Sequence, residues 1–210
     1  LAMTRSVTVV CGGVGAARFM RALADVHPPS DTAAVINTGD DTVLHGLSIS
    51  PDIDTVIYTL AGAIDPERGW GLRGESWRAM ESLERYAAVK PEDSAAAPTW
   101  FNLGDRDLAT HLYRTARLAE GASLTLVTAE IAAAWGLEQW LLPMTDDTVS
   151  TMVGLREERV EVPFQEYFVK RRHNVPVDAV RFAGAAAASL TALARTALVD
   201  SEVVVIAPSN

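Results

Sequence analysis

Two adjacent carboxylates, Asp40 and Asp41, follow a short apolar run near the start of the chain. They end the segment Asn37-Thr38-Gly39-Asp40-Asp41, which comes directly after a stretch typical of a β-strand. Carboxylates are hard oxygen ligands, and Mg²⁺ binds through one or two of them together with the phosphates of a substrate. Only one of the pair needs to face a metal, since Asp41 can instead cap a turn. The segment is therefore a candidate magnesium and phosphate site.

A glycine run stands a short distance upstream. Gly12-Gly13-Val14-Gly15 separates an apolar, β-branched stretch from a helical pattern that includes Arg18. Glycines let the backbone approach a ligand closely, and the N–H groups at the start of the following helix can bind an anion. The run is not a P-loop, because no Gly-Lys-Ser or Gly-Lys-Thr follows, and Arg18 stands where the dinucleotide-binding fingerprint has a small residue. It predicts either a phosphate cradle or a tight turn without a ligand.

Two further acids stand in Pro51-Asp52-Ile53-Asp54, the first turn of a predicted helix that Ser50 can cap. The helix macrodipole favours acids at this place regardless of function, so Asp52 either stabilises the helix start or has a functional role, with the first interpretation favoured. Asp54 is the better candidate to face a metal.

Polar residues also begin a helix further along the chain. Asp105, Arg106, Asp107 and His111 stand in or just before its first two turns. Asp107 and His111 are four residues apart and share one helical face, either as an ordinary surface pair or as part of a metal site. Two ligands without a third are too few to indicate zinc.

Two more polar segments follow apolar, strand-like stretches. The first holds an Asp pair and is also typical of a hairpin turn. The second either directs polar groups into a ligand crevice or begins a surface loop. Their residues are Met144-Thr145-Asp146-Asp147 and Pro208-Ser209-Asn210.

Several classes of function are disfavoured. None of the four histidines stands near a nucleophile-elbow motif, and Cys11 has no base close in sequence, which argues against covalent catalysis. A formal net charge of −9 argues against nucleic acid as a partner. The single cysteine fits a reducing compartment, and no apolar stretch reaches the roughly 20 residues of a membrane span. We therefore expect a cytoplasmic protein.

Hydrophobic periodicity predicts the elements that position these segments. Residues 6–11 and 33–37 are predicted strands on either side of a helix, which makes a βαβ unit. The expected fold is α/β, a doubly wound, Rossmann-like parallel sheet with its site beyond the carboxyl ends of the strands. One domain is expected over residues 4–210, with a helical insertion over about residues 51–136. Further helices are expected at 75–88, 105–120, 124–135 and 183–194, and strands at 141–142, 151–155, 164–169, 181–182 and 202–207.

Taken together, these segments resemble the ordered motif set of the 2-phospho-L-lactate transferase family. The resemblance runs from about Val7 to the last residue, and six segments in one order are far more specific than any one of them. It implies a homodimer that moves a phospho-lactyl or phospho-enolpyruvyl group from its guanosine-diphospho-activated form. The acceptor would be the ribityl hydroxyl of 7,8-didemethyl-8-hydroxy-5-deazariboflavin, with release of GMP, in coenzyme F-420 biosynthesis.

The resemblance also implies residue roles, since the protein's work in phosphoryl transfer is mainly positioning and charge stabilisation. Asp40, helped by Asp54, would bind Mg²⁺, and Asn37 would orient Asp40 or the attacking hydroxyl. The residues implied for the diphosphate are Gly12, Gly13, Gly15, Arg18, Pro208, Ser209 and Asn210. Those implied for the deazaflavin and acid pockets are Asp41, Asp105, Arg106, Asp107, His111, Met144, Thr145 and Asp146.

One feature departs from the family. Family members continue well past the Pro-Ser-Asn motif, so the family's C-terminal portion is expected to be absent, in a fragment or in a shortened protein.

Two alternative functions also remain. A nicotinamide-dependent oxidoreductase would share the strand, glycine turn and helix. A non-catalytic nucleotide-binding regulator of the gluconeogenesis-factor branch would share the glycine loop. Such regulators carry Gly-Gly-Ser-Ser after the Asp pair, where this chain has Thr42-Val43-Leu44-His45-Gly46.

Overall fold

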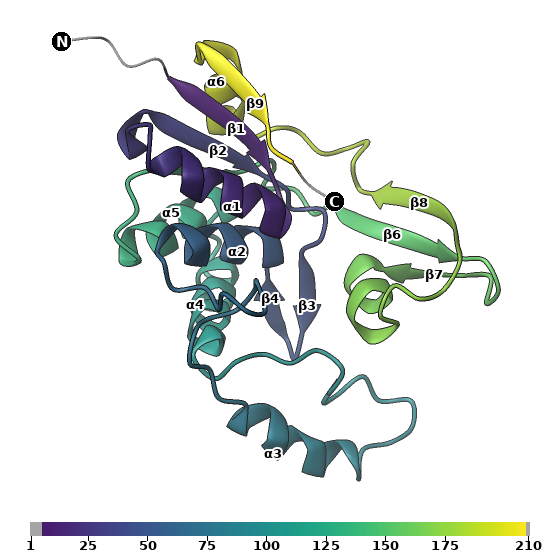
Figure 1. Cartoon of the computed structure of the whole chain (residues 1–210). Coiled ribbons are helices and arrows are strands. Elements are labelled where there is room, and N and C mark those ends of the chain that lie inside the picture. Colours follow the sequence, from purple (N-terminus) through teal and green to yellow (C-terminus); the bar gives the residue numbers. More distant parts are fainter. Residues whose placement is uncertain (1–5, 209–210) are drawn as a thin grey trace.

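A four-stranded parallel sheet forms the centre of the molecule (Figure 1). The computed structural model describes residues 6–208. The strands lie in the order β5-β2-β1-β9, and each pairs with its neighbour in parallel. Their bounds are β1 (Val7–Cys11), β2 (Thr32–Ile36), β5 (Trp140–Pro143) and β9 (Val203–Ile206). The predicted strands near 6–11, 33–37, 141–142 and 202–207 are thus confirmed.

Helices cover both faces of this sheet. Ala34, Ile36 and Leu141 pack on one face with helices α1, α2 and α5. The intervening Val35 and Leu142 pack on the other face against α6. Because neighbouring strand residues point to opposite faces, this division confirms the doubly wound α/β fold. The helix bounds are α1 (Gly13–Ala24), α2 (Pro51–Leu60), α5 (Leu124–Ala134) and α6 (Ala192–Asp200).

A second layer of structure extends from the sheet on the side of α2. It contains α3 (Arg78–Ala87), α4 (Asp107–Ala119) and the hairpin of β3 (Thr42–Leu44) and β4 (Leu47–Ile49). Ile49, Met80 and Leu103 form its small core. The hairpin was not predicted from the sequence. Its two turn residues, His45 and Gly46, both have positive φ angles, as a two-residue turn between short strands requires.

A separate antiparallel sheet follows β5, in the order β7-β6-β8. Its strands are β6 (Ser150–Leu155), β7 (Val160–Pro163) and β8 (Val177–Ala183). Val153, Leu155 and Val162 are buried between this sheet and its own loops. The backbone N–H of Thr151 donates to the carbonyl of Gly39 at 2.6 Å, so the sheet is joined to the Asp40 segment.

Two of the predicted elements are wrong. Residues 164–169 contain a short π-helical segment, η2 (Glu166–Lys170), and not a strand. Phe164 and Tyr167, three apart, pack on the same small core, which a strand's alternation does not allow. The predicted helix at 183–194 is irregular up to Thr191. Gly184 has a φ of +84°, and Ser189 N–H donates to Asp147 at 2.8 Å, so tertiary contacts override the alanine propensity.

Within the described residues, the helices are too short and insufficiently apolar for any of them to cross a lipid bilayer. A short 3₁₀ turn, η1 (Pro29–Asp31), leads into β2.

Candidate active site at the carboxyl end of the parallel sheet

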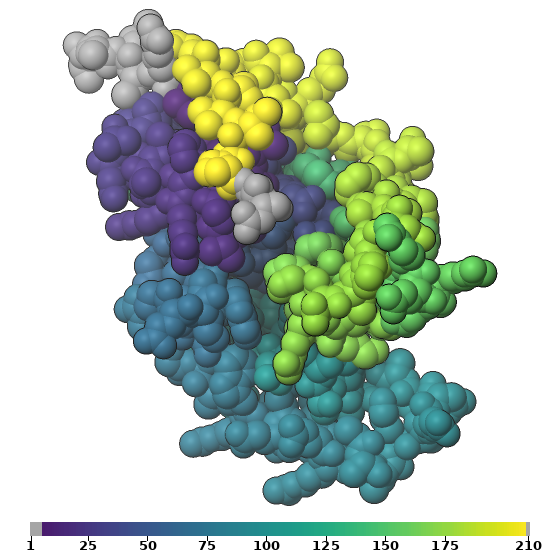
Figure 2. Space-filling model, turned by 45° about the vertical axis from the view of Figure 1, so that its right-hand side comes forward, coloured from purple at the N-terminus to yellow at the C-terminus, as the bar shows by residue number. Residues whose placement is uncertain are grey.

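The glycine turn and the Asp40 segment leave the sheet side by side. Cys11 pairs with Ile36 at the carboxyl ends of β1 and β2, and the backbone N–H of Asn37 donates to the Cys11 carbonyl at 2.9 Å. Gly12 and Asn37 are the next residues of the two strands. Figure 2 shows the surface hollowed between the N-terminal part of the chain, in purple, and the part of the chain drawn in green. The structure therefore brings the first two candidate segments to one crevice.

Asp52 points from the start of α2 to the glycine turn. Its Oδ2 accepts a hydrogen bond from Asn37 Nδ2 at 2.8 Å, and the backbone N–H of Gly13 also stabilises the carboxylate. A Cβ on Gly12 would lie 2.8 Å from Asp52 Oδ2. Burial raises the pKa of Asp52, and these two hydrogen bonds only partly offset the effect. Because an acid in a first helical turn is also expected for the helix dipole alone, the sequence did not reveal this contact of Asp52.

Asp40 and Asp41 are costly to ionise in this crevice. Burial, followed by the negative charge of Asp52, raises the pKa of Asp40 to about 6, against a hydrogen bond from Thr151 that lowers it. Burial raises the pKa of Asp41 to about 8, although Ser50 Oγ donates to its Oδ2 at 2.7 Å. Among the described residues, Asp41 Oδ1 is buried without a hydrogen-bond partner.

These carboxylates fit a divalent cation. Asp40, Asp41 and Asp52 all have raised pKa values because burial removes water from the charged form. An ion with two positive charges would offset that cost and the repulsion between Asp40 and Asp52. Hard oxygen donors of this kind suit Mg²⁺.

Asp54, Asp107 and His111 form a second group that could hold a metal ion, with ligand atoms within 4.8 Å of one another. This group is buried, so Asp107 and His111 are not an ordinary surface pair. However, Arg114 is also fully buried, and its guanidinium contacts both oxygens of Asp54, with Nη1 to Oδ2 at 3.1 Å. A metal ion here would have to displace a positive charge that is already paired. Among the described residues, no other set of three ligand groups lies this close together, so a metal at Asp40 and Asp52 would be held by fewer protein ligands.

Comparisons with known proteins identify the family. Residues 7–210 match the family described as 2-phospho-L-lactate transferase CofD. This chain belongs to the 2-phospho-L-lactate transferase family. A phosphoenolpyruvate transferase of Mycobacterium tuberculosis is 42% identical to it over 97% of this chain and 64% of that protein. The phosphoenolpyruvate transferase of Mycobacterium avium is also 42% identical, over 97% and 65%. The chain thus spans somewhat less than two thirds of the length of these relatives.

A solved structure shows the same fold. A member of the UPF0052 family from Bacillus halodurans superposes with a TM-score of 0.61, at 13% identity. The match covers 99% of this chain and 60% of the other. At this identity the likeness concerns the fold alone.

Two of the residues that the family resemblance implied for the deazaflavin pocket accept hydrogen bonds from helix starts. Asp105 accepts hydrogen bonds from the backbone of Arg78 and Ala79 at 3.1 Å, so it caps α3. Asp146 accepts from the backbone and hydroxyl of Thr125 at 2.7 and 2.8 Å, at the start of α5. Both carboxylates are engaged in holding a helix terminus.

Three other members of that set lie in two segments, Arg106 just before α4 and Met144 and Thr145 just after β5. Arg106 Nη1 donates to the carbonyl of Arg73 at 2.8 Å, and Thr145 Oγ1 donates to that of Ser189 at 2.7 Å. Met144 packs in the small core beneath α6. As part of this pocket, these residues stay a prediction.

The structure describes most of the residues that the resemblance implied for the diphosphate. Gly13 is the first residue of α1, with a φ of +70°, and Arg18 lies one turn further along, beside a cavity of about 190 Å³ lined also by Val14 and Gly69. Pro208 follows β9 at the same end of the sheet as Gly12, because β9 runs parallel to β1. Ser209 and Asn210 lie outside the described residues.

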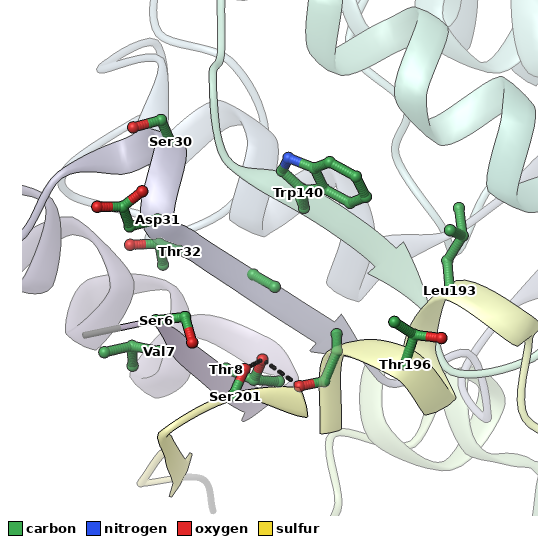
Figure 3. A pocket seen from close by; sticks show the side chains of 12 residues that line it. Ser6, Val7, Thr8, Ser30, Asp31, Thr32, Trp140, Leu193, Thr196 and Ser201 are labelled. Carbon is green, nitrogen blue, oxygen red and sulfur yellow. Dashed lines mark hydrogen bonds between the residues drawn. The ribbon is translucent and has the colours of Figure 1, made fainter. Parts of the chain in front are cut away.

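A larger cavity, of about 240 Å³, lies at the opposite end of the sheet (Figure 3). Thr8 and Ser201, whose hydroxyl oxygens are 2.5 Å apart, line it together with Trp140. Asp31 supplies the one carboxylate of its lining. Because its described lining holds no pair of acids, this cavity lacks the means to hold a metal and a diphosphate.

Besides the contact of Asp52, the roles of Arg114 and Thr151 were not predicted from the sequence. Arg114 stands three residues after His111 and seven after Asp107, so all three share one face of α4. That spacing was the available signal. Thr151 ends a polar segment without a periodic pattern, and only the tertiary fold brings its hydroxyl to Asp40.

Proposed function

We propose that this chain carries the catalytic site of a transferase of coenzyme F-420 biosynthesis. The enzyme would move a phospho-lactyl or phospho-enolpyruvyl group from its guanosine-diphospho-activated form to the ribityl hydroxyl of 7,8-didemethyl-8-hydroxy-5-deazariboflavin. Family membership supports the class of reaction. The observation that carries the proposal is the position of Asp52, which contacts Asn37 and the glycine turn beside Asp40.

The start of α1 would receive the diphosphate. Helix N-termini bind phosphates because their first N–H groups lack partners within the helix. Here, however, Asp52 already approaches Gly12 and Gly13, and two anions in contact repel each other. A diphosphate beside Asp52 therefore requires a cation, which is why the proposal includes Mg²⁺.

Asp40 and Asp52 would hold Mg²⁺, with Asp41 close to them. Bound there, Mg²⁺ would supply neutralisation of the charge on the diphosphate. Asn37 orients this pair, since its Nδ2 donates to Asp52 and its Oδ1 accepts from the N–H of Gly39 at 3.0 Å. Asp54 is the weaker candidate for the metal, because Arg114 occupies its oxygens.

The proposed chemistry is an in-line displacement at phosphorus. The ribityl oxygen forms a bond to the phosphorus that bears the phospho-acid. The bond from that phosphorus to the phosphate oxygen of GMP breaks, GMP leaves with the electron pair, and the hydroxyl proton is released. The protein positions the reactants and stabilises charge without a covalent intermediate. We also propose a homodimer in the cytoplasm, on the basis of the family.

Calorimetric titration of the chain with the hydroxy-deazariboflavin, with and without Mg²⁺ and GDP, tests the proposal. We expect saturable binding that both additions strengthen, because alcohol, metal and diphosphate would share one crevice. Asp40→Asn should lose the Mg²⁺ effect, whereas Asp31→Asn, a change in the cavity at the opposite end of the sheet, should keep it.

Other results would contradict the proposal. Binding of GDP without the deazaflavin would favour the nucleotide-binding regulator. Tight binding of NAD that GDP does not affect would favour an oxidoreductase.

A further inference from the structure

Arg114 is the largest fully buried side chain among the described residues. A buried guanidinium is stable only when specific partners satisfy it. Its two terminal nitrogens contact the two oxygens of Asp54, and Nη1 also lies 3.4 Å from the carbonyl of Ser48. Arg114 therefore links α4 to the first turn of α2 and to β4.

Two series of neighbouring residues connect this guanidinium to the acids of the crevice. Asp54 shares the first turn of α2 with Asp52, whose carboxylate receives the hydrogen bond of Asn37. Ser48 lies in β4, two residues before Ser50, which donates to Asp41 at 2.7 Å. A change in the position of Arg114 would thus reach the acids of the crevice through both series.

The charge of Arg114 also acts on the crevice directly. The positive guanidinium stabilises the ionised form of Asp41, against the burial that disfavours it. Arg114 has no exposed surface, so it cannot contact a substrate. Its influence on the reaction must therefore pass through its charge and through the residues that it holds in place.

We infer that Arg114 is a positioning residue, which fixes the first turn of α2 and the segment of Asp40 and Asp41 in the geometry that receives the divalent cation and the diphosphate. The inference rests on the proposed function for the identity of those ligands. Its structural part, the ordering of residues 37–54 by Arg114, concerns the chain without ligands.

Arg114→Lys is the variant for the first measurement. It keeps the positive charge but loses the paired contact with both oxygens of Asp54. Arg117→Lys is the matched control, because Arg117 lies one turn further along the same helix and pairs with Glu130 at 2.8 Å, away from the crevice. Hydrogen exchange of both variants is measured in EDTA.

In Arg114→Lys, amides of residues 37–54 should exchange at least several times faster than in the wild type, while those of α5 stay unchanged. Arg117→Lys should leave residues 37–54 unchanged. Equal exchange of residues 37–54 in wild type and Arg114→Lys would overturn the inference.

The second measurement is calorimetric titration with Mn²⁺ and then GDP. We expect Arg114→Lys to weaken binding about tenfold or more, the effect of losing one charge-assisted hydrogen bond, and Arg117→Lys to change it less than twofold. A paired variant, Arg114→Met with Asp54→Leu, guards against a loss of fold, because removing both charges leaves neither one buried alone. This paired variant should fold with wild-type thermal stability and still bind Mn²⁺ and GDP more weakly than the wild type.

Wild-type affinity in either variant would show that Arg114 is only structural, and the inference would fall. A wild-type chain that binds neither Mn²⁺ nor GDP would overturn both the proposed function and this inference. Binding of both without any group transfer would overturn the proposed function alone, since the effect of Arg114→Lys on binding would still decide this inference.

Discussion

Gly12 and Asp52 approach so closely that a Cβ on Gly12 would lie 2.8 Å from the Asp52 carboxylate oxygen. It would also lie 3.0 Å from Cβ of Asn37, so the turn has no room for a side chain. The two helices α1 and α2 therefore begin side by side at the end of β1. This approach places an acid within the turn that would receive a phosphate.

Gly12→Ala should destabilise the protein by about 1–3 kcal/mol, because the added methyl group overpacks this contact. It should also weaken GDP binding. Asp52→Ala in the same chain removes the clashing carboxylate and should restore most of the stability. Chemical denaturation of the wild type, both single variants and the double variant measures the coupling. Additive effects of the two changes would contradict a direct contact.

Asp40→Asn should abolish Mg²⁺-dependent turnover and leave the fold intact. Because burial raises the pKa of Asp40 to about 6, the variant should be more stable than the wild type in EDTA above that pH, where the wild-type carboxylate is ionised. The transfer assay and thermal unfolding are run on the same preparation. Wild-type rates in this variant would remove Asp40 from the mechanism. A variant that fails to fold would show instead that the bond with Thr151 is essential to the structure.

Asp41 should make stability depend on pH in the absence of metal. Its pKa is about 8 in the folded chain and near its ordinary value of 3.8 when unfolded. Between these values the folded state binds more protons, so stability falls as pH rises from about 4 to about 8. The group contributes a slope of up to about 1.4 kcal/mol per pH unit.

Asp41→Asn removes this titration and keeps an oxygen that can accept from Ser50. In EDTA, its free energy of unfolding should equal that of the wild type near pH 4 and exceed it near pH 8. Urea denaturation across this range is the measurement. Parallel curves for the two proteins would show that Asp41 is ionised in the folded chain at neutral pH.

The sequence was a good guide to the elements that have a clear period. The patterns of residues 6–11 and 33–37 predicted two parallel strands, which the structure places side by side, with Gly12 and Asn37 together at their ends. Local patterns also misled. Phe164 to Val169 has the composition of a strand, yet Phe164 and Tyr167, partly buried, pack on the same core at a helical spacing. Here packing against the β6–β8 core outweighed propensity.

The direction of side chains was beyond the sequence. Asp52 and Asp54 are two residues apart in one helical turn, and a periodic pattern cannot tell which of them faces the crevice. Contacts with distant residues decide it. Asn37 donates a hydrogen bond to Asp52, and Arg114, sixty residues away in the sequence, donates to Asp54. Such long-range partners leave a local signal only on α4, where Asp107, His111 and Arg114 share a face.

Tyr58→Phe tests whether the buried group of Asp54, Asp107 and His111 has a structural role and holds no metal. The Tyr58 hydroxyl, almost fully buried, donates to Asp107 Oδ1 at 2.5 Å and lies 2.8 Å from the Thr110 hydroxyl. Burial and the neighbouring Asp54 and Asp107 raise its pKa, so the hydroxyl keeps its proton as a donor. Removing it leaves an oxygen of Asp107 buried without that partner, which costs about 1–3 kcal/mol.

The matched control is Tyr113→Phe, on the same helix as Asp107. The Tyr113 hydroxyl donates to Glu130 at 2.9 Å in an exposed position, where water replaces a lost bond, so its removal should cost less than about 0.5 kcal/mol. Urea denaturation of both variants gives the two free energies, and titration with Mg²⁺ and GDP should give wild-type affinities for both. A Tyr58→Phe variant that keeps its stability but loses affinity for Mg²⁺ would place the metal at Asp54, Asp107 and His111, and would move the cation site away from Asp40 and Asp52.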